Sequence, residues 1–189
     1  MAQALLRVSV QRREQALRYL RDSDRRLSLA AYLLLEEALE KEYGILEPPT
    51  FEYGPHGKPF LKDYPHIHFN LSHCTGTALC VVSDAPVGCD VENVNPILDE
   101  DLCRRTCSEE ELSRIRNSYR PTVAFALLWT RKEAFLKYTG EGLTECLEEV
   151  LLSPEAKAVN FESVVSPGGE FVYTVCRPIQ TRRSDKQVG

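Results

Sequence analysis

The amino-acid sequence predicts an α+β fold, because helical and strand-like patterns are mixed without a regular strand–helix–strand order. Two stretches, 24–43 and 121–140, carry apolar residues at the spacing of helices with one buried face. Short apolar or alternating runs, bounded by Gly, Pro and polar residues, are typical of strands. These runs occupy residues 67–73, 77–83, 87–92, 159–165 and 170–176.

Residues 1–85 are expected to form an N-terminal half. Its start combines Arg residues with a short apolar run, which favours a strand leading into a helix. The long helix at 24–43 follows, and Gly44 is suited to end it. Residues 44–65 are dense in Pro and Gly, so we expect turns and loop before the first pair of strands.

Residues 86–189 are expected to form a C-terminal half that starts with a strand and a loop. Ser108 followed by Glu111 has the form of a capping box, which predicts a short helix over 109–117. Pro121 begins the longer helix, and two strands joined by a Pro-Gly-Gly turn close the half. The repeated order of helix followed by strands suggests two related halves.

The composition is that of a soluble globular protein, with 43% hydrophobic and 27% charged residues. No apolar run reaches the roughly 18 residues that span a membrane, and the net charge of −5 argues against nucleic-acid binding. The seven cysteines form no CxxC pair and no Cys/His cluster, which favours reduced thiols. Since the first residues lack the features of a signal peptide, we expect a cytoplasmic protein.

Two carboxylates, Asp90 and Glu92, flank a single apolar residue at the end of the third predicted strand. Alternation along a strand places both on one face, where their like charges repel. Cys89 and Val91 then point to the opposite face and into the core. Unless the strand end simply faces water, a positive charge is needed to offset the repulsion.

The long second helix supplies a third carboxylate, Glu133, at the border of its apolar face. Three carboxylates that converge on one point make an oxygen site suited to Mg²⁺. The competing interpretation is an ordinary surface ion pair between Glu133 and Lys137, which are four residues apart on one helix face.

A Mg²⁺ ion held by few carboxylates normally acts on a phosphate ester or a pyrophosphate. Candidate phosphate contacts lie in a loop, at a strand end and in the first turn of the first long helix. They are Gly57, Lys58, Pro59, Ser72, His73, Arg25 and Arg26. For any one of them an exposed structural role is the simpler interpretation, and only the set together with the acids indicates a phosphate-bearing substrate.

Four motifs in this order, GKPFL, FNLSH, VGCDVE and WTRKEAFLK, resemble those of the 4′-phosphopantetheinyl transferases of the Sfp-like (surfactin-synthetase-activating) type. The resemblance covers residues 20–175. It implies two similar α+β halves with the active site between them. It also implies transfer of the 4′-phosphopantetheine arm of coenzyme A to a serine of an acyl or peptidyl carrier protein, with release of adenosine 3′,5′-bisphosphate.

The same resemblance implies the catalytic residues. Asp90, Glu92 and Glu133 would be the Mg²⁺ ligands, and Lys137 would contact the pyrophosphate of coenzyme A and neutralise the departing charge. The proton of the attacking hydroxyl needs an acceptor, and Glu133 is the first candidate. Glu133, Lys137 and Asp90 are therefore the expected catalytic set.

The remaining matches concern the binding of coenzyme A. His73, together with Ser72, would meet its phosphates, with His73 at the 3′-phosphate. Residues 57–59, the Gly-Lys-Pro segment, would hold the adenine end. Arg26 is the best match for a phosphate-binding arginine of the first helix, and Arg25 takes that place after a shift of one residue.

Two other functions would use part of this pattern. A non-catalytic relative that binds a partner protein would not need three acids in register, and a Mg²⁺-dependent phosphatase or nuclease would leave the GKP and SH elements without a role. A concentration of arginines after the acid strand predicts either a docking face for an acidic carrier or a solvated surface. These are Arg104, Arg105, Arg114, Arg116 and Arg120. Because one chain supplies both halves, we expect a monomer.

Overall fold

The structure is a computed structural model that describes residue 8 and residues 10–142, 144 and 146–179. Helices and strands are mixed along the chain, which confirms the predicted α+β class. Across these described ranges, no helix combines the length and the apolar character needed to cross a membrane. All seven cysteines are free thiols.

The first long helix, α3 (Asp22–Tyr43), begins two residues before the predicted start and ends where the sequence predicts. Gly44 adopts a φ of 68°, a conformation that favours glycine, and its amide donates a hydrogen bond to the carbonyl of Glu40. The buried side of α3, including Leu35, faces the strands that follow. A shorter helix, α2 (Val10–Leu17), precedes it, and the strand predicted before this helix lies largely outside the described residues.

A short antiparallel hairpin interrupts the segment that was predicted as turns and loop. β1 (Phe51–Tyr53) pairs with β2 (Pro59–Leu61), so the prediction was wrong for these residues. Strands of three residues are too short for alternation to be visible, and the intervening Pro and Gly form the tight connection between them. Gly57 has a φ of 82°, and the amide of Gly54 donates to the carbonyl of Lys58 at 2.9 Å.

The remaining strands match the predicted segments to within two residues at each end. β3 (His68–Cys74) pairs antiparallel with β4 (Thr77–Ser83). A second antiparallel sheet has the order β5–β7–β6, formed by β5 (Gly88–Asn93), β7 (Phe171–Pro178) and β6 (Val159–Val165).

Among its described residues, the later part of the chain contains three short helical elements that the sequence did not predict, at 100–106, 147–152 and 154–157. α4 (Glu100–Thr106) follows the loop after β5, and the side chain of Asp99 caps it by accepting from the amide of Leu102. The capping box of Ser108 and Glu111 is confirmed at the start of the next helix. The other helical elements are α5 (Glu109–Arg116), α6 (Pro121–Thr139), the 3₁₀ helix η1 (Leu147–Leu152) and α7 (Pro154–Lys157).

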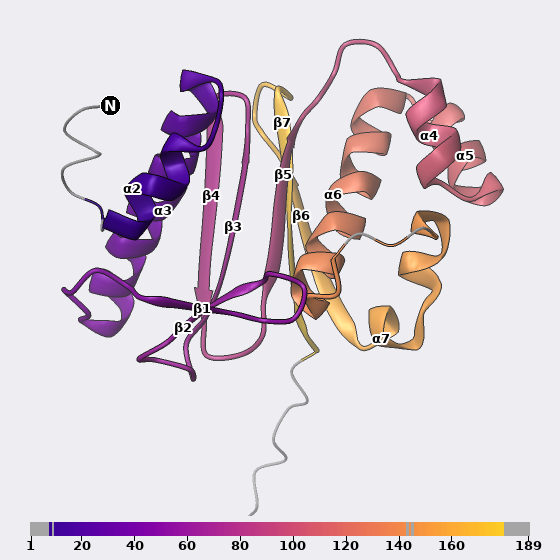
Figure 1. Ribbon diagram of the computed structural model, residues 1–189. Helices are drawn as coiled ribbons and strands as arrows, with labels where there is room; N and C mark the ends of the chain where they lie inside the picture. The colour runs from indigo at the N-terminus through magenta and orange to yellow at the C-terminus, as the bar shows by residue number, and fades with distance from the viewer. Residues whose placement is uncertain (1–7, 9, 143, 145, 180–189) are drawn as a thin grey trace, which may run out of the picture.

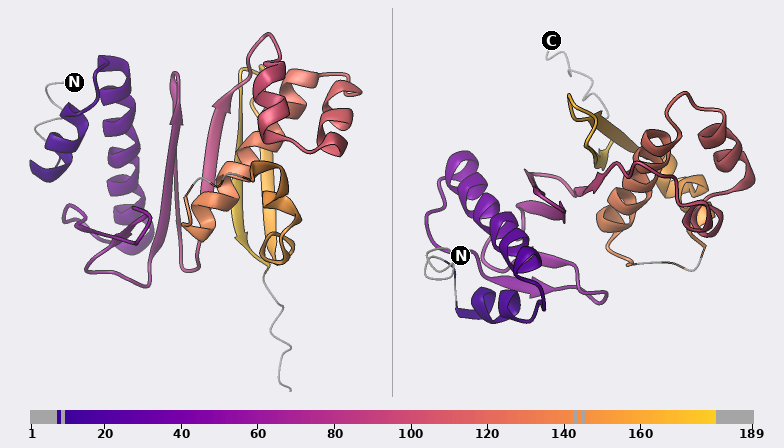
Figure 2. Two further views of the ribbon diagram at one scale, coloured as in Figure 1. Left: turned by 45° about the vertical axis from the view of Figure 1, so that its right-hand side comes forward. Right: turned by 90° about the horizontal axis from the view of Figure 1, so that it is seen from above.

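The strands stand between two groups of helices (Figure 1). α3 packs on β3 and β4, and α6 packs on β5 and β7, so that each long helix covers its own set of strands. The turned views show α2 beside α3, and α4, α5 and α7 gathered around α6 on the other side (Figure 2). Apolar cores therefore lie between each long helix and its strands.

β3 and β5 lie side by side, but they belong to different sheets. Side chains of β3 join them instead. The side-chain oxygen of Asn70 accepts from the amide of Cys89 at 2.9 Å, and the hydroxyl of Ser72 accepts from the amide of Val91 at 3.3 Å. This seam joins the two sets of strands, and it is where the predicted acid strand meets the predicted SH motif.

Gly88 controls how closely α6 approaches β5. A Cβ atom at this position would lie 2.1 Å from the carbonyl oxygen of Ala134 and 2.4 Å from the amide nitrogen of Tyr138. Both are backbone atoms of α6, so the contact is relieved only by moving the helix. We expect Gly88→Ala to lower the free energy of unfolding by about 2–3 kcal/mol, as overpacking does.

Urea denaturation measures this effect, and Gly54→Ala is the matched control. A Cβ atom at Gly54 meets its nearest neighbour, the carbonyl oxygen of Lys58, at 3.7 Å, an ordinary contact distance. Its free energy of unfolding should change by no more than about 0.5 kcal/mol. Equal losses of stability in the two variants would show that Gly88 does not determine how closely α6 packs against β5.

Candidate active site

Asp90 lies at the centre of the candidate site, on β5, with 3% of its surface exposed. Its Oδ1 accepts hydrogen bonds from the hydroxyl of Ser72 at 2.8 Å and from the ammonium of Lys137 at 2.5 Å. Its Oδ2 is buried and has no hydrogen-bond partner within the described part of the chain. Since buried carboxylate oxygens normally meet a donor or a cation, Oδ2 marks a position that favours a cation.

Strand alternation positions Asp90 as the sequence predicts. Cys89 and Val91 are buried in the core, Cys89 beside Val175 of β7. Asp90 lies on the other face of the strand, toward α6, and the close approach of that helix at Gly88 brings Lys137 within hydrogen-bond distance.

Glu92 and Glu133 are close enough to Asp90 for their charges to interact. Burial raises the pKa of Glu92 to about 7, and the charge of Asp90 adds to this rise, while a hydrogen bond from Trp129 and the charge of Lys137 oppose it. Burial also raises the pKa of Glu133, again with a contribution from Asp90 and with Lys137 opposing. Glu92 and Glu133 therefore stand in an environment that disfavours their negative charges, and the charge of Asp90 is part of the cause for both.

The acids fit Mg²⁺ by the chemistry of their donors. Mg²⁺ takes carboxylate oxygens and completes its octahedron with water or phosphate oxygens, and Oδ2 of Asp90 has no partner among the described residues. As the side chains stand, no three His, Cys, Asp or Glu residues within the described ranges are close enough to hold one metal ion. Side-chain adjustment is therefore needed for Asp90, Glu92 and Glu133 to reach a single ion.

A pocket of about 290 Å³ opens beside Glu133, the one member of the three acids that lines it in the described part of the chain. The Gly57, Lys58 and Pro59 segment forms part of its wall, and Glu133 and Lys137 of α6 form another part. The structure thus brings together two motifs that are distant in the sequence. A partly apolar pocket with a few charged groups is typical of a small-molecule site.

The ammonium of Lys58 has a structural role that the sequence did not reveal. It donates to the carbonyl of Tyr138 at 2.9 Å and lies 3.4 Å from the carbonyl of Val87. A cation at the last carbonyls of a helix is favoured by the helix dipole, and burial lowers the pKa of Lys58. The charge of Lys58 therefore holds the β1–β2 hairpin to the end of α6, and Lys58 and Pro59 both line the pocket.

Ser72 and His73 differ in their surroundings. The hydroxyl of Ser72 is buried and engaged by Asp90, Lys137 and the amide of Val91. His73 is partly buried; burial lowers its pKa, and the charge of Lys137 lowers it further. The lowered pKa does not by itself favour a charged imidazole, so the assignment of His73 to a phosphate stays a prediction.

The two candidate arginines of α3 also differ. Arg25 donates to the carbonyl of Tyr19 and forms an ion pair with Asp22 at 2.8 Å, so its guanidinium is engaged locally. Arg26 is exposed. Neither arginine forms a hydrogen bond or ion pair with Ser72, His73 or the acids in the described part of the chain, so their assignment to a phosphate stays a prediction.

Sequence reasoning missed Arg12 of α2. Its guanidinium donates to the hydroxyl of Ser28 at 2.7 Å and lies 5.3 Å from the centre of the Tyr32 ring. It is close enough to His73 for its charge to contribute to lowering the pKa of that imidazole. The sequence carries no local signal for this contact, because α2 comes near the SH motif through its packing on α3 in the folded chain.

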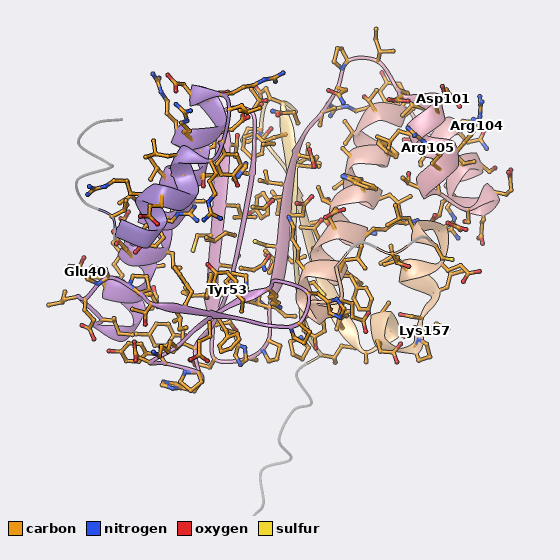
Figure 3. The ribbon with its side chains drawn as sticks, in the orientation of Figure 1. Glu40, Tyr53, Asp101, Arg104, Arg105 and Lys157 are labelled. Atoms are coloured by element: carbon orange, nitrogen blue, oxygen red, sulfur yellow. The ribbon has the colours of Figure 1, made fainter. Side chains whose placement is uncertain are left out.

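The arginines proposed as a docking face carry acidic partners on the same surface. Arg104 lies within 3.9 Å of Glu100 and 3.5 Å of Asp101, while Arg116 lies 2.6 Å from Glu100. Figure 3 shows Asp101, Arg104 and Arg105 together on α4, at the outer side of the molecule. Neighbouring acids partly neutralise this surface, and its role as a docking face stays a prediction.

The raised pKa of Glu92 predicts a distinctive pH dependence of stability in the metal-free protein. A carboxyl with a pKa of about 7 in the folded chain and 4.5 as its ordinary value binds its proton more tightly when folded. Its protonation stabilises the fold at low pH, and this contribution is lost as the pH rises through the folded pKa. Between about pH 5 and about pH 8 the melting temperature should therefore fall by a few degrees more than that of Glu92→Gln.

Scanning calorimetry in the presence of a chelator measures the two pH profiles. The comparison with Glu92→Gln is needed because burial lowers the pKa values of His68 and His73, whose contributions run in the opposite sense over the same range. Parallel profiles for the two proteins would contradict the raised pKa of Glu92.

Comparison with known proteins identifies what this arrangement is similar to. The family model of the 4′-phosphopantetheinyl transferase superfamily matches residues 86–175, which include the acid strand and α6. A 4′-phosphopantetheinyl transferase of Bacillus subtilis is 33% identical over 141 residues, which cover 72% of this chain and 62% of that protein. The 4′-phosphopantetheinyl transferase Sfp of Bacillus subtilis strain 168 is 30% identical over 140 residues, with 72% and 62% covered.

This chain covers a larger share of a further relative. The 4′-phosphopantetheinyl transferase AcpT of Salmonella typhi is 33% identical over 136 residues, which are 70% of this chain and 68% of that protein. The chain therefore spans about three fifths of the two Bacillus proteins and about two thirds of the Salmonella protein.

Proposed function

Because the chain belongs to the 4′-phosphopantetheinyl transferase superfamily and resembles its Sfp-like members, we propose that it transfers the 4′-phosphopantetheine arm of coenzyme A to a serine of a carrier protein. The carrier is an acyl or peptidyl carrier protein. Adenosine 3′,5′-bisphosphate is the second product. A non-catalytic, partner-binding role is the alternative.

The state of Asp90 is the observation that carries this proposal. One of its oxygens is held by Ser72 and Lys137, and the other is buried without a partner among the described residues. Glu92 and Glu133 stand beside it, with pKa values raised in part by its charge. A buried carboxylate oxygen without a donor, beside two further acids, favours the binding of a cation. A surface that only binds a partner protein would not require a cation at this position.

Asp90, Glu92 and Glu133 would hold the Mg²⁺ ion. When bound, the ion would offset negative charge on the pyrophosphate of coenzyme A, a main source of catalysis in phosphoryl transfer. The side chain of Lys137 is 30% exposed and lines the same pocket as Glu133. It would contact the same pyrophosphate and neutralise charge on the departing phosphate.

The transfer step is a substitution at phosphorus. The serine oxygen of the carrier forms a bond to the phosphorus that bears the pantetheine arm, and the bridging oxygen of the pyrophosphate leaves with adenosine 3′,5′-bisphosphate. Glu133 would accept the proton of the hydroxyl. It lines the pocket, and its pKa is raised toward the range in which a carboxylate serves as a base.

The remaining contacts to coenzyme A are assigned by position. Residues 57–59 would hold the adenine end against the wall that they form in the pocket. His73 would meet the 3′-phosphate, and Arg26 is the proposed helix arginine because Arg25 is engaged by Asp22. This divides the work between residues 1–85, which bind coenzyme A, and residues 86–189, which carry the acids. We further propose a cytoplasmic monomer.

Incubation with coenzyme A, Mg²⁺ and an apo carrier protein tests the proposal. Mass spectrometry should show the carrier heavier by one phosphopantetheine arm, and the gain should vanish when the carrier serine is replaced by alanine. Release of adenosine 3′,5′-bisphosphate without a modified carrier would indicate a hydrolase instead. Binding of the carrier with neither product would indicate the non-catalytic role.

A further inference from the structure

The hydroxyl of Ser72 makes three contacts inside the candidate site. It donates to Oδ1 of Asp90 at 2.8 Å, accepts from the amide of Val91 at 3.3 Å and lies 3.0 Å from the ammonium of Lys137. Ser72 is 6% exposed and Asp90 is 3% exposed. A serine hydroxyl has one hydrogen to donate and two lone pairs, so these contacts use its full capacity.

These contacts divide the two oxygens of Asp90 between different partners. Oδ1 receives the hydrogen of Ser72 and a hydrogen of Lys137, whereas Oδ2 has no partner among the described residues. The hydrogen bond from Ser72 to Oδ1 fixes the rotation of the Asp90 carboxylate about the Cβ–Cγ bond. Without it, Lys137 alone would hold the group, and either oxygen could turn toward the ammonium.

We propose that Ser72 is a positioning residue that keeps Oδ2 of Asp90 available to a divalent cation. In this role the hydroxyl has no remaining hydrogen to offer a phosphate, so the role replaces the phosphate contact that the resemblance implies for the Ser72 side chain. The inference rests on the proposed function for the presence of the cation. Residues that hydrogen-bond to a metal-binding carboxylate orient it, and their loss typically weakens metal affinity by about 10–100-fold.

Asn70 provides a matched control on the same strand. Two residues before Ser72, it forms the other bond of the β3–β5 seam, from the amide of Cys89 to its side-chain oxygen at 2.9 Å. It is 8% exposed, and it makes no hydrogen bond to Asp90 within the described chain. Removal of either side chain loosens the seam, but only removal of the Ser72 hydroxyl releases Oδ1 of Asp90.

The experiment is a titration of the full chain with Mn²⁺, followed by electron paramagnetic resonance, for wild type and four variants. Asp90→Ala defines which binding belongs to this site. Ser72→Ala should weaken that binding by about tenfold or more, and Ser72→Thr, which keeps a hydroxyl, should retain most of the affinity. Asn70→Ala should bind Mn²⁺ as wild type does, and both alanine variants at the seam should melt at a lower temperature.

Three results would overturn the inference. Wild-type affinity in Ser72→Ala would show that the hydroxyl does not position Asp90. Equal weakening in Asn70→Ala would assign the effect to the seam as a whole. Identical titrations of wild type and Asp90→Ala would remove the cation site itself. Because this readout uses neither coenzyme A nor a carrier, a wild type that binds Mn²⁺ through Asp90 yet transfers nothing contradicts the proposed function alone.

Discussion

Glu133→Gln is expected to reduce the turnover number for phosphopantetheine transfer by at least about a hundredfold. The substitution keeps the size of the side chain and one acceptor oxygen, but it replaces the other oxygen with an NH₂ group and removes the negative charge. It therefore takes away a proposed cation ligand and the proposed proton acceptor at once. Because burial and the charge of Asp90 already disfavour ionisation of Glu133, the neutral amide should not destabilise the fold.

The measurement is the initial rate of carrier modification at saturating Mg²⁺ and coenzyme A, together with the melting temperature. Glu162→Gln, an exposed position on β6, makes the same chemical change away from the site and should leave the rate unchanged. Full activity of Glu133→Gln at saturating Mg²⁺ would disprove the assignment of this residue. A loss of rate accompanied by unfolding would instead assign Glu133 to the core.

The elements that the sequence predicted are those with a local signal. The alternation that places Asp90 opposite Cys89 is confirmed, and so is the capping box at Ser108; α6 ends at Thr139, within one residue of the predicted stretch 121–140. In each case the periodicity or the terminal residue lies within a few positions of the feature it determines. The acid strand and the helix that carries Glu133 could therefore be placed without knowledge of the tertiary fold.

The missed elements are either too short to show a pattern or depend on distant contacts. The strands around Gly57 have three residues each, and α4 has seven, so neither shows a clear period. Lys58 looked like a loop cation, yet its ammonium is held by carbonyls that only the fold brings near. The contacts of Ser72 arise in the same way, since they exist only where β3 lies against β5.

Lys132 of α6 is a buried charged residue that sequence reasoning did not single out. It is 1% exposed, and its ammonium donates to the carbonyl of Thr106 and to Oε2 of Glu111, both at 2.7 Å. The same Oε2 accepts from the amide of Ser108 at 2.9 Å in the capping box. One buried cation thus joins the end of α4 and the start of α5 to α6.

We expect Lys132→Met to lower the free energy of unfolding by about 3–5 kcal/mol, the usual effect of removing one partner of a buried ion pair. Methionine fills most of the space of the lysine stem, so the loss is electrostatic: Glu111 keeps a largely buried charge, and the carbonyl of Thr106 loses its donor. Urea denaturation measures the change. Lys157→Met, at an exposed position on α7 that Figure 3 labels at the edge of the molecule, is the control and should change stability by no more than about 0.5 kcal/mol.

The double variant Lys132→Met/Glu111→Gln separates the ion pair from simple packing. Glutamine still offers an oxygen to the amide of Ser108, so the cap of α5 is kept while the unpaired charge is removed. The double variant should therefore be more stable than Lys132→Met alone, because a buried pair replaced on both sides is close to neutral. If both proteins lose the same stability, the lysine stem and not its charge holds α4 and α5 against α6.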